Sequence, residues 1–456
     1  MVRNGGRCSL SVAGRLLLGI AALLWRHEEA RSQVDPAGSE FQVNTYTSGL
    51  QRYPSVASDA RGNFVVVWTS EGSAGSDQDY LSIHLQRFSA AGSRLGGELQ
   101  VNSYTSGSQY DSVAASDAVG DFVVVWTSDG SNGPDDDGFS IQAERIDADG
   151  APLTDQFQVN AYTTSWQGVS AVASNRRGGF VVAWSSLGSR GTDDYMSIQA
   201  RRLSGIGAPA GGQFQVNGHT PGVQKMPAVS CDGSGRCVIA WASDGSNGTD
   251  DDGFSIQAQR IDTDGTPLGD QFEVNTYTTG LQYWPAVASS ATGDFVVVWE
   301  SEGSSGTDLS RYSIQAQRFS AAGARLGSQF QVNTYTTGDQ LRPRVCSDSG
   351  GGFVVVWTSY GSSGSDDDLT SVQARRYDAS GVPLGDQIQV NSQTTEDQFE
   401  PTVASDALGG FVVTWTNVGA TGTDPAWSIR GQRYVEALFY DGFEGGDTEG
   451  WTRTVP

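Results

Sequence analysis

Cysteine and histidine are scarce in this sequence, with four cysteines and three histidines among 456 residues. No Ser/His/Asp triad, phosphate-binding loop or zinc site can be read from it. Basic residues are also few, because 28 of them stand against 52 acidic residues and the formal net charge is −24 at pH 7. A chain this acidic repels nucleic acid and anionic membrane surfaces and favours cations. The 14 prolines beside 59 glycines predict many tight turns rather than disorder.

Long apolar runs are also missing, except near the start of the chain. Met1–Arg15 contains three arginines and no acid, and Leu16–Trp25 is an apolar run of ten residues. This run is too short to span a bilayer, and Ala30 and Ser32 are small residues suited to a cleavage site. Residues 1–32 are therefore predicted to be a secretory signal peptide, followed by a linker over 33–39. The mature chain is expected to be secreted or cell-surface, without membrane insertion.

The dominant feature of the rest is a repeat of the segment FVVVW, first seen at Phe64–Trp68. The spacing of its tryptophans is 58 residues, once 57, which is typical of a repeat architecture. The seven tryptophans, predicted to be structural, are Trp68, Trp126, Trp184, Trp241, Trp299, Trp357 and Trp415.

The repeated strand is apolar on both faces, so both faces must be covered. Stacking similar small sheets radially achieves this and predicts an all-β fold, a single seven-bladed β-propeller over residues 40–436 with four antiparallel strands per blade. In the first copy the strands are expected at 41–44, 55–59, 64–70 and 82–88. The long connections 44–54 and 71–80 then share one face of the disc, the long-loop face, where function is expected.

The two ends of the repeat array are complementary. A strand of FQVN type precedes the first set of three strands at Phe41–Asn44, and none follows the last set, which ends near Tyr434. We therefore expect Phe41–Asn44 to complete the last blade and close the ring. A closed ring of this kind is expected to be a monomer.

Acidic loops of the pattern G-x-x-G-x-D recur in the second long connection. Carboxylates on a glycine-rich turn can supply oxygen ligands to Ca²⁺, the one cofactor considered. Alternatively, a single aspartate accepts backbone N–H groups and fixes the turn, and the complete spacing of a calcium loop is missing. The candidate calcium ligands are Asp129, Asp135, Asp137, Asp244, Asp250, Asp252, Asp366 and Asp368.

The first long connection repeats N-x-x-T-x-x-x-Q with an aromatic residue between the polar ones. Amide and hydroxyl groups beside a ring can hold a sugar, whereas the structural alternative is a set that ties one loop to its neighbour. The candidate ligand-binding residues are Tyr46, Tyr104, Tyr162, Tyr277 and Tyr335.

Two further residue sets are predicted to be structural. Cys231 and Cys237 flank one turn and are expected to form a disulfide in an oxidising compartment. An arginine recurs in the third strand of each copy, where it is expected to bond turn carbonyls or a turn aspartate. These arginines are Arg87, Arg145, Arg202, Arg260, Arg318, Arg376 and Arg433.

The segments QFQVNTYTTGDQ, GGFVVVWTS and SIQAQRF resemble tandem units of secreted bacterial surface and adhesin-like proteins. The tail over 437–456, with DGFEGGDTEGW, resembles the short DGFESGDTSAW ends of bacterial secreted proteins. The rigidity, symmetry and acidity of the repeat and the lack of catalytic motifs favour a secreted or surface-associated binding module, not an enzyme, that recognises an extracellular glycan or protein through the long-loop face. The alternative is a glycan-active hydrolase or lyase, with an active site built from residues that differ between copies.

Overall fold

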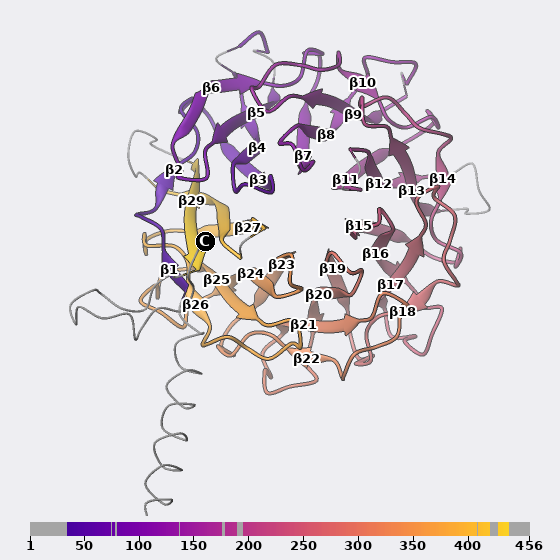
Figure 1. Ribbon diagram of the computed structural model, residues 1–456. Coiled ribbons are helices and arrows are strands. Elements are labelled where there is room, and N and C mark those ends of the chain that lie inside the picture. Colours follow the sequence, from indigo (N-terminus) through magenta and orange to yellow (C-terminus); the bar gives the residue numbers. More distant parts are fainter. Residues whose placement is uncertain are drawn as a thin grey trace, which may run out of the picture. The chain divides into compact units, whose positions relative to one another are not determined.

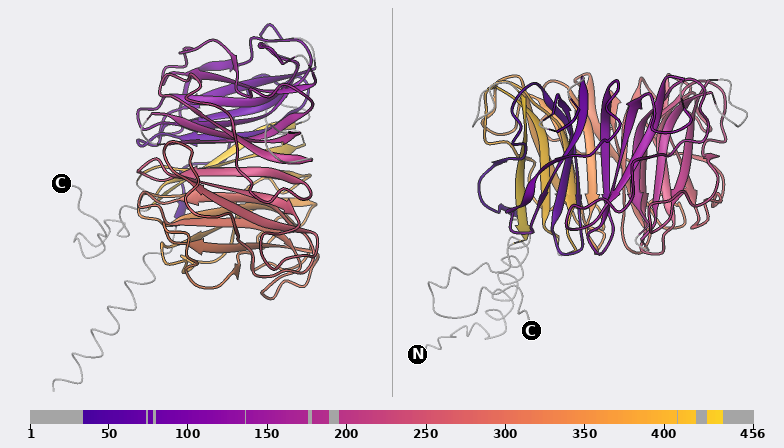
Figure 2. Two further views of the ribbon diagram at one scale, coloured as in Figure 1. Left: turned by 90° about the vertical axis from the view of Figure 1, so that its right-hand side faces the viewer. Right: turned by 90° about the horizontal axis from the view of Figure 1, so that it is seen from above.

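The structure is a computed structural model that describes residues 34–436, except 74, 78–79, 136, 176–177, 189–194, 408 and 420–426. The predicted signal peptide and the tail over 437–456 lie outside the described residues. Pro36–Val435 form one compact unit, a disc of seven sheets around a central channel (Figures 1 and 2). Among the described residues, no helix is long and apolar enough to cross a membrane. The predicted seven-bladed β-propeller is confirmed.

Six of the seven sheets have four antiparallel strands in the order inner, second, third and outer, and the last sheet has a fifth, short strand beside its third one. The inner strands are β3 (Gln51–Ser58), β7 (Gln109–Ser116), β11 (Gln167–Ser174), β15 (Gln224–Cys231), β19 (Gln282–Ser289), β23 (Gln340–Ser347) and β27 (Gln398–Ser405). The second strands are β4 (Phe64–Glu71), β8 (Phe122–Asp129), β12 (Phe180–Leu187), β16 (Cys237–Asp244), β20 (Phe295–Glu302), β24 (Phe353–Tyr360) and β28 (Phe411–Val418). The third strands are β5 (Leu81–Phe88), β9 (Phe139–Ile146), β13 (Met196–Leu203), β17 (Phe254–Ile261), β21 (Tyr312–Phe319), β25 (Thr370–Tyr377) and β29 (Trp427–Glu436).

The outer strands are shorter, and most consist of two residues. They are β6 (Arg94–Gln100), β10 (Phe157–Gln158), β14 (Phe214–Gln215), β18 (Phe272–Glu273), β22 (Phe330–Gln331) and β26 (Ile388–Gln389), and β2 (Phe41–Gln42) takes this place in the last sheet. A further short strand, β1 (Val34–Pro36), lies in the segment expected as a linker.

The core lies between the blades, where each tryptophan of the FVVVW strands is fully buried. Trp126 of β8, for example, packs in one cluster with Val65 and Val67 of β4 and with Ile83 and Leu85 of β5, in the preceding blade. Alternate residues of each second strand therefore face opposite neighbouring blades, which is why this strand is apolar on both faces.

The ring closes as expected. β2 pairs with β29, so that Phe41 lies opposite Gly431 in the ladder. Val43 N donates to Ile429 O (2.8 Å), and Ile429 N donates to Asn44 Oδ1 (2.9 Å). The first and last parts of the described chain thus share one blade, where indigo meets yellow in Figure 1.

The face with the short turns is held by the repeated arginines. Arg202 Nη1 donates to Thr263 O (2.8 Å), Arg260 Nη1 donates to Ala322 O (2.7 Å), and Arg433 donates to Ala90 O across the ring closure. Arg145 also forms a buried ion pair with Asp117 (2.8 Å). The three bonds to carbonyl groups each join a third strand to a turn of the next blade, whereas the Arg145–Asp117 ion pair lies within one blade.

The predicted disulfide is confirmed. Cys231 and Cys237 lie opposite each other at the end of the β15–β16 ladder and are bonded.

Candidate active site

Two cavities lie on the axis of the ring, at opposite ends of the inner strands. One, of about 330 Å³, is lined by residues from the last part of each inner strand and the short turn after it. The other, of about 300 Å³, is lined by residues from the first half of the inner strands and lies on the long-loop face. We call the first the turn-end cavity and the second the mouth pocket.

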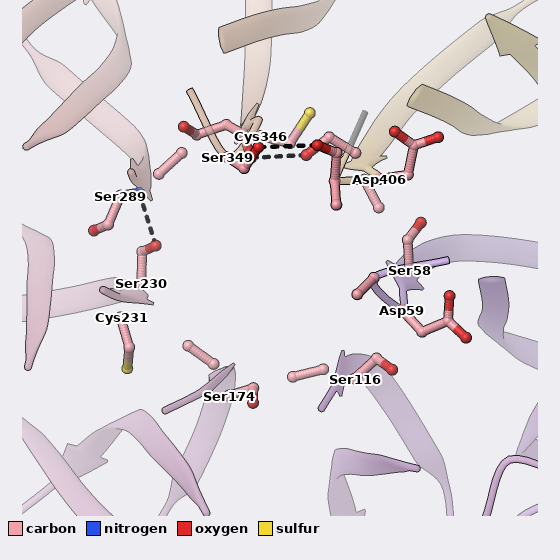
Figure 3. A pocket seen from close by; sticks show the side chains of 18 of the residues that line it. Ser58, Asp59, Ser116, Ser174, Ser230, Cys231, Ser289, Cys346, Ser349 and Asp406 are labelled. Atoms are coloured by element: carbon pink, nitrogen blue, oxygen red, sulfur yellow. Dashed lines mark hydrogen bonds between the residues drawn. The ribbon is translucent and has the colours of Figure 1, made fainter. Parts of the chain in front are cut away.

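The turn-end cavity is lined mainly by small residues, together with the carboxyl groups of Asp59, Asp117 and Asp406. Ser58, Ser116, Ser174 and Ser230 lie around its open centre (Figure 3). Its hydroxyl groups join neighbouring blades, since Ser230 Oγ accepts a bond from Ser289 N (3.0 Å). No arginine or aromatic ring lines it within the described part of the chain. Its three aspartates each accept a backbone N–H of their own turn, so this cavity offers less for catalysis than the mouth pocket.

The turn-end cavity also contains the free thiol of Cys346. Burial raises the pKa of this thiol to about 12, so at neutral pH it is protonated and a poor nucleophile.

The mouth pocket is organised by one residue in each inner strand that has a left-handed backbone. The seven residues have φ between 48° and 59° and are Tyr53, Asp111, Val169, Met226, Trp284, Arg342 and Glu400. Each falls where the register of the inner strand with the second strand is interrupted, as between Arg52 and Ser55. A left-handed non-glycine residue costs about 1–2 kcal/mol, and such strain concentrates at functional sites.

The sequence interpretation placed these residues in a loop, and that boundary is wrong. β3 begins at Gln51 rather than Ser55, so Tyr53 belongs to the strand. Proline follows the left-handed residue in five of the seven copies, as Pro54 does, and it was taken as the end of a connection. Proline has no N–H to give to the ladder, and the structure accommodates it in a β-bulge.

The left-handed residues are chemically unlike, although the repeat around them is nearly constant. Six of the seven line the mouth pocket, all but Met226. Their backbone N–H groups are held in a repeated way, since Tyr53 N donates to Thr416 Oγ1 (3.2 Å) and Glu400 N to Thr358 Oγ1 (3.0 Å) of the preceding blade. At these seven positions the fold therefore fixes the backbone, and the side chain can differ from one blade to the next.

Blades five to seven supply a compact group of charged and aromatic side chains. The guanidinium of Arg342 stacks on Trp284, with Cζ 3.7 Å from the ring centroid. Arg342 Nη1 lies 3.9 Å from Glu400 Oε1. The other oxygen, Glu400 Oε2, is buried and has no hydrogen-bond partner among the described residues. A buried carboxyl oxygen without a hydrogen-bond partner makes the ionised form of the group costly.

Two carboxyl groups of the mouth pocket hold protons more tightly than usual. Burial, with a smaller contribution from Asp111, raises the pKa of Glu400 to about 7, although Arg342 and Arg344 oppose the rise. Burial also raises the pKa of Asp111, against the charges of Arg342 and Arg52. Displaced carboxyl pKa values in a cavity are typical of acid and base catalysts.

A third carboxyl group, that of Glu300, bonds the backbone of Arg342. Glu300 of β20 stands where other copies have a small residue or threonine, as in Thr358, and its Oε2 accepts a bond from Arg342 N (3.0 Å). Burial raises the pKa of Glu300, and the backbone N–H of Arg342 opposes this. Glu300 thus replaces the hydroxyl that anchors the left-handed residue in other blades and adds a charge beside the arginines.

Aromatic pairs surround the mouth pocket on the same face. Each pair joins the residue before a left-handed position to the first residue of a third strand. The pairs and the distances between their ring centroids are Tyr110 with Phe139 (5.8 Å), Tyr283 with Phe254 (4.7 Å) and Phe399 with Trp427 (5.5 Å). The mouth pocket therefore lies within a partly exposed aromatic rim.

The tyrosines predicted to bind a ligand lie elsewhere. None lines the mouth pocket, and each packs beside a glycine of the second long connection, as Tyr104 does beside Gly130 and Tyr335 beside Gly361. Tyr46, Tyr162 and Tyr277 are placed equivalently, beside Gly72, Gly188 and Gly303. The five residues are distributed one per blade and do not converge on one site, and ligand binding by them stays a prediction.

The polar residues of the first long connection tie loops and strands together. Asn160 Nδ2 donates to Asp135 Oδ2 (2.7 Å), and its Oδ1 accepts a bond from Ile141 N (2.9 Å). The glutamine of the motif reaches the core, since Trp68 Nε1 donates to Gln51 Oε1 (2.9 Å).

The candidate calcium ligands are partly engaged in similar bonds. Asp250 and Asp366 each accept a bond from an asparagine, at 2.6 Å. Asp137, Asp252 and Asp368 each accept a backbone N–H from the neighbouring long connection. Asp129 and Asp244 end their second strands. Among the described residues no cluster of three or more His, Cys, Asp or Glu side chains is placed to hold a metal. Calcium binding by these loops stays a prediction.

No protein-family model matches the sequence, and no curated protein matches it. Among solved structures, a protein of unknown function from Dyadobacter fermentans DSM 18053 is similar, with a TM-score of 0.51 and 10% identity over 88% of this chain and 98% of that one. An α-L-arabinanase of Penicillium chrysogenum in complex with arabinobiose has a TM-score of 0.46 and 13% identity, over 86% and 98%. The polysaccharide lyase Uly1 has a TM-score of 0.49 and 9% identity, over 89% and 94%.

The prediction that the chain is not an enzyme is contradicted. It rested on the absence of a recognisable catalytic group, but the ring brings Asp111, Arg342 and Glu400 together from three blades. Two of the solved structures just described are of enzymes, an α-L-arabinanase and a polysaccharide lyase. Neither the composition nor the periodicity of the sequence predicts this group of residues. The sequence does show that the left-handed position is occupied by a different residue in each repeat.

Proposed function

We propose that this protein is a glycan-active enzyme, a glycoside hydrolase whose active site is the mouth pocket. The observation that carries the proposal is the set of unlike left-handed residues at one end of an otherwise repeated channel. It includes two carboxyl groups with raised pKa values and an aromatic ring. Hydrolysis of a glycosidic bond requires two carboxyl groups, one that gives a proton and one that acts on the opposite side of the bond.

Glu400 is the proton donor in this proposal. With a pKa of about 7 it keeps its proton in a substantial fraction of molecules at neutral pH. Its Oε1 lies 3.9 Å from Arg342 Nη1, and its Oε2 is buried without a partner among the described residues, so the protein does not hold the carboxyl group by a hydrogen bond at either of these atoms. The proton moves to that oxygen as the bond to the anomeric carbon breaks, so that the leaving sugar departs as an alcohol.

Asp111 acts on the attacking water. In its ionised form it accepts one proton of the water, while the water oxygen bonds to the anomeric carbon. Arg342 and Arg52 favour this ionised form. The raised pKa that burial gives Asp111 makes its carboxylate a stronger base than an exposed aspartate. The products are two sugars with free hydroxyl groups, and no further reactant is needed.

Hydrolysis is favoured over elimination, the reaction of a lyase, by the character of Tyr53. Elimination requires a base strong enough to remove a proton from carbon. The pKa of Tyr53 is raised by burial and by the nearby Glu400, so this phenol keeps its proton. No histidine or lysine lines the mouth pocket among the described residues.

The proposal is tested by measuring reducing ends released from a panel of polysaccharides by the parent and two variants. Glu400→Gln should lower the rate by about 10²- to 10⁴-fold, the usual contribution of a general acid. Met226→Leu is the matched control, because Met226 has the same left-handed position but does not line the mouth pocket. Equal rates for the parent and Glu400→Gln, or unsaturated products absorbing near 230 nm, would exclude this assignment.

A further inference from the structure

We propose that the mouth pocket selects a glycan whose sugar carries a carboxylate, a uronate, and that Arg342 and Arg344 hold this group while the bond is cleaved. This inference rests on the proposed function and deepens it by naming the substrate class. It sets the protein apart from hydrolases of neutral glycans.

The charge of the mouth pocket contrasts with that of the chain. The whole sequence has a formal net charge of −24. Yet the short stretch of β23 that enters the pocket brings two arginines, Arg342 and Arg344, and Arg52 stacks on Tyr53 nearby, with Cζ 5.2 Å from the ring centroid. An acidic protein would repel an anionic polymer, so a local group of cations is needed for such a substrate to bind.

The repeat itself shows that Arg344 is not required by the fold. The equivalent residues two positions after the other left-handed residues are small or β-branched, and they are Ser55, Val113, Ala171, Ala228, Ala286 and Thr402. These residues line the same inner strands without any charge. Arg344 therefore adds a guanidinium where the architecture needs only a small side chain.

The two guanidinium groups lie close enough to repel each other. Burial lowers the pKa of Arg344, and the charge of Arg342 lowers it further. Holding two like charges together in a partly buried pocket costs free energy unless an anion lies between them. The protein supplies part of that compensation, because the charges of Glu400 and Glu300 favour the ionised form of Arg344, but Glu300 bonds only the backbone N–H of Arg342.

The arginines retain donors for a ligand. Each guanidinium has five N–H groups. Arg344 Nη1 donates to Pro343 O (3.0 Å), and the contact of Arg342 with Glu400, at 3.9 Å, is too long for a hydrogen bond. Stacking on Trp284 fixes the plane of Arg342 and leaves its edge available. A planar carboxylate matches such an edge with two parallel bonds.

The position of these arginines also links recognition to catalysis. Arg342 lies between Trp284 and Glu400, so a carboxylate bound to it would lie near the proposed proton donor. A negative charge there opposes the ionisation of Glu400 and helps it to keep its proton. A uronate would thus support the acid that cleaves its own glycosidic bond.

The test measures binding by calorimetry to the full-length Glu400→Gln protein, which should not consume its ligand. The probes are short oligomers of galacturonate, mannuronate and hyaluronan, each with its counterpart in which the carboxyl groups have been reduced to alcohols, and a sulfated galactan oligomer. We expect at least one uronate oligomer to bind about ten- to a hundredfold more tightly than its reduced form, the effect of one charge-assisted hydrogen bond or two. Arg344→Met should remove this preference, and Arg61→Met, a surface arginine on a short turn, should keep it.

The outcomes separate the inference from the proposed function. Equal binding of uronate and reduced oligomers, failure of every uronate oligomer to bind, or a preference for the sulfated oligomer alone would each overturn the uronate assignment. Hydrolysis of a neutral glycan by the parent protein would then still support the proposed function. A preference for uronate that Arg344→Met abolishes, without any hydrolysis by the parent, would support the inference and exclude the proposed reaction.

Discussion

Strand β7 carries an aspartate near each end, and the two have opposite roles. Asp117 follows the strand at the turn end, where its Oδ1 accepts the backbone N–H groups of Val119 and Asp121 and its Oδ2 accepts a bond from Arg145 (2.8 Å). Asp111 lies at the mouth in a left-handed conformation, and burial raises its pKa. Both aspartates line a cavity, but Asp117 has its hydrogen-bond partners supplied by the turn and by Arg145, whereas Asp111 lies among the charged residues of the mouth pocket.

The difference shows at which end of the channel the fold allows the side chains to vary between copies. At the turn end, tight turns and arginine bonds to the next blade require similar residues in most copies. At the mouth, a β-bulge fixes only the backbone, through bonds such as Tyr53 N to Thr416 Oγ1. Side chains that the scaffold does not need can diverge there, which is how a symmetric ring acquires an asymmetric site.

The largest expected effect comes from changing the two aspartates of β7 separately. Asp111→Asn should lower the hydrolysis rate by about 10²- to 10⁴-fold with little change in melting temperature, because it removes a base that the fold does not use. Asp117→Asn should lower the free energy of unfolding by about 3 kcal/mol, because it breaks a buried ion pair. Initial rates and thermal melts of both variants check this pair of outcomes. If Asp111→Asn lowered the free energy of unfolding as much as Asp117→Asn, the fold would depend on both aspartates and the contrast between them would be wrong.

The second prediction concerns pH and Glu400. The pKa of this group rises from 4.5 to about 7 on folding, so the folded state binds its proton more tightly than the unfolded state. That stabilisation is complete below about pH 4.5 and is lost as the pH rises through 7, a loss of up to roughly 3 kcal/mol. The Glu400→Gln variant has no carboxyl group to ionise, so it does not lose this stabilisation. Its free energy of unfolding should therefore rise relative to that of the parent between pH 4.5 and pH 8.

Urea unfolding of both proteins at these two pH values measures the difference. Other carboxyl groups with raised pKa values, such as Glu144 and Asp250, are present in both proteins. Their contributions to the pH dependence of stability are therefore the same in the two proteins and do not affect the difference. A parent and variant whose stabilities change in parallel with pH would show that Glu400 ionises normally.

A smaller effect is expected from the disulfide at the turn end. The bond between Cys231 and Cys237 spans a sequence separation of 6 residues. Its removal by a Cys231→Ser and Cys237→Ser double substitution should lower the free energy of unfolding by about 2 kcal/mol in the chain-entropy model. Because the bond lies at the opposite end of β15 from the mouth, the rate per folded molecule should not change. A loss of rate without a loss of stability would mean that the two ends of the channel are coupled.

The smallest effect tests the strain at the mouth. Val169 is β-branched and has φ of 51°, a conformation that asparagine adopts far more readily. Val169→Asn should therefore raise the free energy of unfolding by about 1 kcal/mol, measured by urea unfolding. Val172→Asn in the same strand, outside the left-handed position, is the control and should be destabilising. A loss of stability in both variants would show that the left-handed backbone stores no recoverable strain.

Most of the fold could be predicted because it depends on repetition. The sevenfold return of FVVVW and the unpaired strand at Phe41 were sufficient for the number of blades and the closure of the ring. The disulfide followed from two cysteines that flank one turn. In each case a local pattern and one physical requirement, the burial of apolar faces or of strand edges, led to a single arrangement.

The candidate site could not be predicted in the same way. Trp284, Arg342 and Glu400 lie about one repeat apart in the chain, and they come together because the ring places equivalent positions around one axis. The strand boundary also mattered, since Pro54 and its counterparts indicated a loop where the chain forms a bulge. The candidate site residues were chosen among positions that repeat, whereas the pocket is formed by residues that differ between copies, which were considered only for the alternative of a glycan-active enzyme.

The pairing of β2 with β29 has a consequence for how the protein is made. The bond from Ile429 N to Asn44 Oδ1 joins residues separated by 385 positions. During synthesis the chain emerges from its N-terminal end, so β2 waits without its partner until nearly the whole chain has been made. Such distant contacts form slowly, and an unpaired strand edge favours aggregation in the meantime. Productive assembly should therefore be limited by the arrival of the last blade, and prematurely ended chains should be prone to degradation even when six blades are present.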